Sequence, residues 1–214
     1  MKLIKFLSML IVLVACSQNI SAQSSEALLS DLQSGWAVAN YQLKDKDQIK
    51  AFEQLITRGE ASLSRNSNNA EIQIWTGIIK STLAGAKEGL GALGLAKAAK
   101  THLEKAITLN DKALNGSAYT SLGVLYNNVP GWPIGFGDKK KSEKYLRKAL
   151  EINPNGIDSN YFYADFLLSK KKYIDAQVYF DKALQASPRT GRNLADAGRR
   201  KEIDLALASI QKKL

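Results

Sequence analysis

Two stretches of this chain repeat one another at a fixed distance. Residues 142–154 read S-E-K-Y-L-R-K-A-L-E-I-N-P, and residues 176–188 read A-Q-V-Y-F-D-K-A-L-Q-A-S-P. Both contain Lys-Ala-Leu at the same place and both end in a proline, Pro154 or Pro188, so the period is 188 − 154 = 34 residues. Such a period is typical of a chain built from stacked copies of one unit, because a single unit cannot bury its own apolar face.

The spacing inside the repeat predicts helices. Ala176, Phe180 and Ala183 lie four and three residues apart, so they share one face of a helix. The alanines let a neighbouring helix come close, and Phe180 fills the space beside them. The proline that ends each stretch cannot continue a helix. No long segment alternates apolar and polar residues as a strand does, so the sequence predicts an all-α fold.

A small residue, a large apolar residue and a closing proline at this period resemble the tetratricopeptide repeat (TPR). Gly123 and Tyr126 resemble the glycine and tyrosine of the first helix of such a repeat, and Gly77 resembles the same glycine in an earlier unit. The resemblance implies a TPR-type α-solenoid over residues 24–214. We expect about four helical hairpins and a C-terminal capping helix over residues 194–214.

The same resemblance implies a function. In a TPR solenoid the first helix of each pair lines a concave groove, which commonly holds an extended peptide or a helix of a partner protein. The resemblance therefore implies a protein–protein interaction adaptor or scaffold. Carried onto this chain, the groove-facing positions are Ile74, Ile78, Thr120, Val124, Asn127, Asp158, Tyr161 and Asp165.

Residues 1–22 have the pattern of a secretory signal peptide, with a basic start, an apolar run and a small-residue end. Two cleavage sites compete. Residues 13–16 resemble a bacterial lipobox, in which the peptide ends at residue 15 and Cys16 carries a lipid anchor to the membrane. Residues 20–22 resemble an ordinary cleavage site. We expect export to the periplasm, either as a lipoprotein or as a soluble protein. For the lipoprotein, Ser17 rather than Asp after Cys16 resembles the sorting signal for the outer membrane.

A glycine- and proline-rich loop over residues 130–138 interrupts the third unit. Its aromatic residues Trp132 and Phe136 are costly to leave in water. They therefore either fold back against the end of the hairpin or form a surface for a partner, and the two can hold together. Asp138 can cap the helix that follows.

The chain is basic, with a net charge of +10, which becomes 10 − 2 = +8 when Lys2 and Lys5 leave with the signal peptide. An acidic envelope protein or peptide fits this charge. Nucleic acid does not fit, because the chain is exported and its basic residues are spread without an aromatic–basic reader motif. Arginines that cluster near the last loop either bind an anionic partner or pair within the chain: Arg189, Arg192, Arg199 and Arg200.

Nothing in the sequence indicates an enzyme. His102 is the only histidine, and no nucleophile motif, metal-ligand pair or phosphate-binding loop accompanies it. We expect no catalytic residue, no cofactor and no metal. A glycine-rich elbow over residues 83–94 spells a dinucleotide motif, but a helix precedes it where that motif needs a strand.

Residues 125–188 carry a second resemblance. A glycine-rich loop followed by G-D-K-K-K-S-E-K-Y-L-R-K-A-L looks like the T-component family of TRAP transporters. Members of that family are periplasmic TPR lipoproteins. This resemblance implies an alternative role as an accessory subunit of a TRAP-type solute transporter that contacts a periplasmic solute-binding protein.

Overall fold

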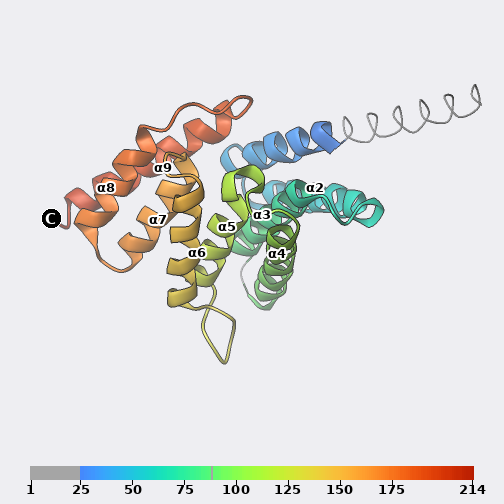
Figure 1. Cartoon of the computed structure of the whole chain (residues 1–214), viewed down its shortest axis with the longest axis horizontal. Coiled ribbons are helices and arrows are strands. Elements are labelled where there is room, and N and C mark those ends of the chain that lie inside the picture. The colour runs from blue at the N-terminus through green and yellow to red at the C-terminus, as the bar shows by residue number, and fades with distance from the viewer. Residues whose placement is uncertain (1–24, 88) are drawn as a thin grey trace, which may run out of the picture.

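The computed structural model describes residues 25–87 and 89–214. The expected signal peptide and Cys16 lie outside these residues. Nine α-helices and one short 3-10 helix, with no strand, make up the part of the chain that is described, which confirms the all-α prediction (Figure 1). The helices are 25–41, α2 (Asp45–Arg65), α3 (Ala70–Ala86), α4 (Leu90–Leu109), η1 (Ala113–Gly116), α5 (Ser117–Asn128), α6 (Lys139–Ile152), α7 (Ile157–Ser169), α8 (Tyr173–Leu184) and α9 (Asn193–Gln211).

The helices form four hairpins followed by α9. Helix 25–41 pairs with α2, α3 with α4, α5 with α6, and α7 with α8. Three apolar cores follow one another along the stack, one around Phe52, one around Leu103 and one around Phe180. The repeat of one helical pair predicted from the sequence is therefore the repeat that the structure shows.

In two of the hairpins, a glycine on the first helix lets the second helix pack closely against it. A Cβ atom on Gly123 of α5 would lie 2.5 Å from Cγ of Leu146 on α6, and one on Gly77 of α3 would lie 2.9 Å from Cγ of Leu103 on α4. A hydrogen bond also joins α5 and α6 at this point, because the Ser142 hydroxyl of α6 donates to the Gly123 carbonyl of α5 at 2.8 Å. Only glycine allows so close a crossing.

The predicted apolar face of α8 is confirmed. Ala176, Phe180 and Ala183 are all 0% exposed and pack in one cluster with α7 and α9. Ile203 and Ile210 of α9 lie in the same cluster, so α9 covers the end of the stack as a capping helix.

The glycine-rich segment 83–94 is mostly helical rather than an extended elbow. α3 continues to Ala86 and α4 begins at Leu90, so only residues 87–89 connect them. Gly89 has φ 88°, which other residues rarely adopt, and is the one glycine here that makes the turn. The helices continue because Leu83 and Ala96 bury their side chains in the cores, which offsets the weak helix propensity of glycine.

α9 also returns to the first hairpin. Ala195 is buried in the same cluster as Trp36 of helix 25–41. Gly198 lies against Tyr41, where an added Cβ would be 2.4 Å from ring atom Cε1. We call these contacts, together with the stacking of Arg192 on Trp75 described below, the closure. In Figure 1 the closure lies where the red C-terminal segment meets the blue helix 25–41.

Candidate functional site

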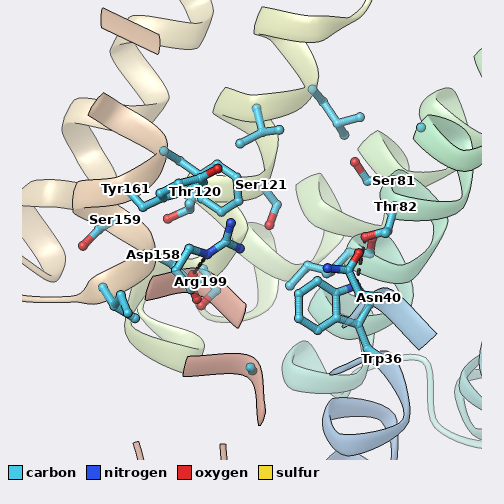
Figure 2. A pocket seen from close by; sticks show the side chains of 18 of the residues that line it. Trp36, Asn40, Ser81, Thr82, Thr120, Ser121, Asp158, Ser159, Tyr161 and Arg199 are labelled. Atoms are coloured by element: carbon cyan, nitrogen blue, oxygen red, sulfur yellow. Dashed lines mark hydrogen bonds and ion pairs between the residues drawn. The ribbon is translucent and has the colours of Figure 1, made fainter. Parts of the chain in front are cut away.

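A groove of about 1270 Å³ runs along the inner side of the stack. The first helix of every hairpin contributes to it: helix 25–41, α3, α5 and α7. The loop before α9 and α9 itself line its remaining side. Figure 2 shows Trp36 and Asn40 on one side, Asp158, Tyr161 and Arg199 on the other, and hydroxyl-bearing side chains between them.

Helical spacing explains why these residues face the groove. Ser117, Thr120, Val124 and Asn128 of α5 line it and are three or four residues apart, so they share one face of the helix. Trp75, Ile78 and Thr82 do the same on α3. The opposite faces of these helices carry the buried core residues, so the groove and the core come from one pattern.

The N-terminal side of the groove is aromatic. The ring of Trp36 lies 5.8 Å from the ring of Trp75 and 5.8 Å from that of Tyr41, in edge-on arrangements. The Trp36 indole Nε1 donates to the Thr82 hydroxyl at 3.0 Å, and that hydroxyl donates to the Ile78 carbonyl at 3.0 Å. The rings are thereby held in fixed positions, and because Trp36 is 8% and Trp75 5% exposed, they form a largely buried wall of the groove.

The C-terminal side combines aromatic rings with charge. The Arg199 guanidinium lies 4.2 Å from the ring centre of Tyr161 and 4.5 Å from that of Phe162. Burial raises the pKa of Tyr161 to about 12, so its hydroxyl stays neutral at ordinary pH. Arg199 itself is 7% exposed. Cation–π contact and ion pairing together hold it.

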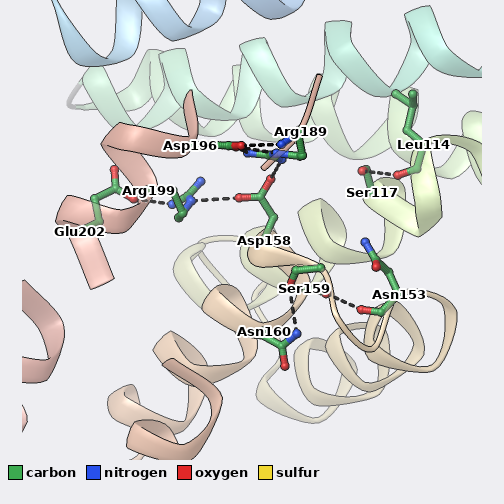
Figure 3. A network of polar contacts seen from close by, with 11 residues as sticks. Leu114, Ser117, Asn153, Asp158, Ser159, Asn160, Arg189, Asp196, Arg199 and Glu202 are labelled. Atoms are coloured by element: carbon green, nitrogen blue, oxygen red, sulfur yellow. Dashed lines mark hydrogen bonds and ion pairs between the residues drawn. The ribbon is translucent and has the colours of Figure 1, made fainter. Parts of the chain in front are cut away.

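Asp158 is the centre of an ion-pair network that joins α7, the last loop and α9 (Figure 3). Its carboxylate accepts from Arg199 Nε at 2.9 Å and from Arg189. Arg189 also binds Asp196, and Arg199 also binds Glu202. Burial raises the pKa of Asp158, but the guanidinium groups of Arg199 and Arg189 outweigh it and bring the pKa to about 2.

Arg192 differs from the other arginines of the cluster. Its guanidinium carbon lies 4.8 Å from the ring centre of Trp75, so it stacks on the opposite hairpin. Its Nε is buried and has no hydrogen-bond partner. Burial and the nearby positive charge of Arg189 lower the pKa of Arg192. Arg200, by contrast, donates to the carbonyl groups of Leu184 and Ala186 at the end of α8.

The structure brings four of the predicted site residues into the groove, namely Asp158, Tyr161, Arg189 and Arg192. Asp165 lies on the same helix but outside the groove lining, and burial raises its pKa. The expected positions Ile78, Thr120 and Val124 also line the groove.

Three expected groove positions were wrong, namely Asp165, described above, Ile74 and Asn127. Ile74 is fully buried in a core, because a shift of one residue turns a helical side chain by about 100° and Trp75 faces the groove instead. Asn127 is absent from the groove lining and accepts from the Lys139 ammonium at 2.7 Å.

The sequence reasoning missed Trp36, Trp75 and Asn40 as groove residues. Trp36 carried a usable signal, since it lies on the first helix of the first unit, but the degenerate repeat there gave no register.

The two aromatic residues of the loop over residues 130–138 lie in different environments. Phe136 folds back onto Tyr126, with ring centres 5.5 Å apart, whereas Trp132 is 90% exposed. Backbone bonds hold the base of the loop, from Gly137 N to the Pro130 carbonyl and from Asp138 N to the Tyr126 carbonyl, both 2.9 Å. Asp138 caps α6 as expected, because its carboxylate accepts from the Lys140 and Lys141 amides.

The described residues contain no group of three histidine, cysteine or acidic side chains that could hold a metal ion. Within the same residues no helix is both long and apolar enough to cross a membrane. His102 lies beside Gln73, with its Nδ1 2.6 Å from the amide oxygen, and burial lowers its pKa.

Comparison with known proteins agrees with this architecture. The family model for the tetratricopeptide repeat matches residues 134–155 and 157–190. A thermophilic TPR protein of Thermus thermophilus has a similar structure, with a TM-score of 0.58 at 16% identity over 89% of this chain and 96% of that one. The protein MamA is similar at a TM-score of 0.47 and 19% identity, over 78% and 91% of the two chains.

One curated relative is similar in sequence. It is the Sol locus transcriptional repressor of Clostridium acetobutylicum, which is 34% identical over 90 residues, or 42% of this chain. The match spans only 25% of the length of that relative. The family model matches residues 134–155 and 157–190, and the fold of the described residues is an all-α helical repeat of the TPR type.

Proposed function

We propose that this protein is an adaptor that binds an extended segment of another cell-envelope protein in its groove. The observation that carries the proposal is the continuous groove lined by the first helix of all four hairpins. Its volume of about 1270 Å³ exceeds the roughly 300–1000 Å³ of ordinary small-molecule pockets, which favours a segment of a polypeptide.

The lining supports the same conclusion. Fixed and largely buried aromatic rings form a rigid wall at one side, whereas hydroxyl and amide groups along α3 and α5 can bond the backbone of an extended ligand. The groove-facing hydroxyls of Ser81, Thr120 and Ser121 carry no charge, so these three positions can accept many sequences. Any preference for particular ligand sequences would come from the residues at the two ends of the groove.

The proposed setting is the periplasm, after removal of the signal peptide and with Cys16 lipidated at the outer membrane. Mass spectrometry of the N-terminal peptide from cell-envelope fractions tests this part by itself. A lipid on Cys16 supports the anchored form, and an N-terminus at Gln23 supports the soluble periplasmic form. An N-terminus that retains Met1 in the cytosol would refute export.

In-cell photocrosslinking tests the adaptor function. A photoreactive residue replaces Ser121, which lines the groove on α5, and a matched control replaces Ser209, an exposed serine of α9 outside the groove. We expect position 121 to link to an extended segment of one envelope protein and position 209 not to. If both positions give the same products, or if 121 gives only links within the chain, the groove is not the binding surface.

The same experiment addresses the alternative transport role. A solute-binding protein linked to position 121 would assign the accessory role in a TRAP-type transporter. That role would be favoured by an apolar pocket beneath Trp132 and Phe136. Trp132 is 90% exposed and Phe136 packs on Tyr126, and neither lines the groove, although Pro130 and Ile134 of the same loop do. The general adaptor is therefore the better-supported function.

A further inference from the structure

Trp132 is exposed to water in the loop that joins α5 to α6. The Gly131 carbonyl accepts from the Ile134 amide at 3.1 Å, so Trp132 lies within a turn whose backbone is internally bonded. In Figure 1 this loop projects beyond the ends of the helices, on the lower side of the stack. Trp36 and Trp75 are buried, so Trp132 is the one tryptophan of the chain whose apolar surface meets water, which is unfavourable.

Lysines lie around the base of this loop. α6 begins directly after it with three exposed lysines, residues 139–141. The turn between α7 and α8 consists of three more exposed lysines, residues 170–172. It lies at the same end of the stack, because the Lys170 ammonium is 3.4 Å from the Glu143 carboxylate near the start of α6. We call this surface the basic edge, and it consists of Trp132, residues 139–144 and residues 170–172.

The positive charge of the basic edge exceeds the negative charge beside it. Residues 138–147 and 165–175 contain eight basic and four acidic residues, which gives a net charge of 8 − 4 = +4. Two of the acids are also bonded within the fold, since Asp138 accepts from backbone amides of α6 and Glu143 pairs with Arg147. Even if every acid is counted against a lysine, four positive charges remain.

Three of the lysines have no charged partner in the part of the chain that the structure describes. No acidic side chain there forms an ion pair with Lys140, Lys144 or Lys172, and no aromatic ring lies beneath their ammonium groups. Lys140 is also in the first turn of α6, where the helix dipole disfavours a positive charge. The stability of the helix therefore does not explain these lysines, whereas an anionic surface outside the molecule does.

A lipid bilayer with anionic headgroups fits this combination of residues. Tryptophan prefers the interface between headgroups and acyl chains, and lysines beside an anionic bilayer are attracted by its surface potential. A protein partner fits less well, because lysine is depleted in protein–protein interfaces. We propose that the basic edge docks on the surface of an anionic bilayer, with Trp132 inserted at the level of the headgroups. Neither Trp132 nor these lysines line the groove, so the protein can hold a bound segment at the same time.

Quenching of tryptophan fluorescence by brominated lipids tests the proposal on the full-length protein. Bromine atoms on the acyl chains quench a tryptophan that enters the bilayer, and Trp132 is the exposed one of the three. The protein is mixed with vesicles of brominated phosphatidylcholine, either alone or with an equal amount of phosphatidylglycerol. We expect quenching at least about twofold stronger on the vesicles with phosphatidylglycerol, and loss of this difference at high salt, because salt screens the attraction.

Two variants assign the quenching to the basic edge. Trp132→Phe should lose it, because the two remaining tryptophans are buried. A triple variant should lose the part that depends on phosphatidylglycerol, and its replacements are Lys140→Gln, Lys144→Gln and Lys172→Gln. The matched control should behave as the wild type, and it replaces three exposed lysines on other helices that form no ion pair with the described residues: Lys50→Gln, Lys105→Gln and Lys201→Gln. Every protein has the same N-terminal residues, so a difference between variants does not come from that segment.

Equal quenching of the wild type on both kinds of vesicle would overturn the proposal, and so would equal quenching of the triple variant and its control. A photoreactive residue at position 132 that links to a protein in cells, without quenching of the purified protein, would also overturn it, because the edge would then be a protein interface. Urea unfolding of each variant should match the wild type, since the replaced side chains are exposed. None of these results changes the crosslinking expected at Ser121, so the adaptor function is judged separately.

Discussion

Replacement of Asp158 by asparagine tests the ion-pair network that joins α7 to the last loop and α9. Asp158→Asn keeps the size of the side chain and removes its charge. The variant leaves Arg189 with Asp196 and Arg199 with Glu202, so neither arginine loses every partner. We therefore expect a loss of about 2 kcal/mol of unfolding free energy at pH 7, below the roughly 3–5 kcal/mol typical of a fully buried broken pair.

The pH dependence of this loss follows from the pKa of Asp158. The pKa falls from its ordinary value of 3.8 to about 2 in the folded protein. A carboxylate with a lowered folded-state pKa contributes stability that is present above its unfolded value and disappears as the pH falls through the folded value. The network should therefore weaken between about pH 4 and pH 2.

The shift in the pKa of Asp158 determines how large this loss of stability is. The change in pKa corresponds to about 2.4 kcal/mol, and the side chain is 34% exposed, so solvent screening reduces the contribution to about 1–1.5 kcal/mol. Asp158→Asn cannot lose this contribution on acidification because it has no carboxylate. The stability difference between wild type and variant should therefore shrink by about 1–1.5 kcal/mol from pH 5 to pH 2.

Urea unfolding followed by circular dichroism at pH 7, 5, 3 and 2 measures this difference. Asp31→Asn is the matched control, because Asp31 pairs with Arg58 on the surface, where both side chains are about half exposed. We expect the control to change stability by less than about 0.5 kcal/mol at every pH. If the difference in unfolding free energy between the wild type and Asp158→Asn stays constant from pH 5 to pH 2, the network does not lower the pKa of Asp158 and the reasoning is refuted.

Two further predictions concern packing. Phe180→Ala should cost about 3–5 kcal/mol of unfolding free energy because Phe180 is fully buried, whereas Trp132→Ala should cost under about 0.5 kcal/mol because Trp132 is 90% exposed. Calorimetry of both variants measures this, and similar melting temperatures for the two would contradict the burial pattern. Gly198→Ala should cost about 1–3 kcal/mol, because its Cβ would meet Tyr41 at 2.4 Å, and should speed amide hydrogen exchange in α9. Unchanged exchange in α9 would show that the closure does not limit its opening.

The helical repeat could be predicted from the sequence because its signals are local. The face formed by Ala176, Phe180 and Ala183, the closing prolines and the close-crossing glycines each depend on residues within one hairpin. Spacing therefore predicted an all-α fold, and the resemblance to the tetratricopeptide repeat supplied the arrangement of the hairpins.

The groove could be predicted only in part. Asp158, Tyr161 and Val124 follow from a clear repeat register, but the first two units have a weak register, so Trp36 and Trp75 were missed. The contact between Arg192 and Trp75 could not be predicted, for another reason. Trp75 and Arg192 are far apart in the sequence, and no spacing rule connects them.

The closure described for α9 also determines how many repeats the protein can contain. An ordinary solenoid can gain or lose a hairpin, because each unit contacts only its neighbours. Here Gly198 must meet Tyr41 and Arg192 must meet Trp75 across the whole stack. Each added or deleted hairpin would rotate and translate α9 away from these contacts. Duplication of a single unit, the usual route by which repeat proteins change length, would therefore open this molecule rather than extend it.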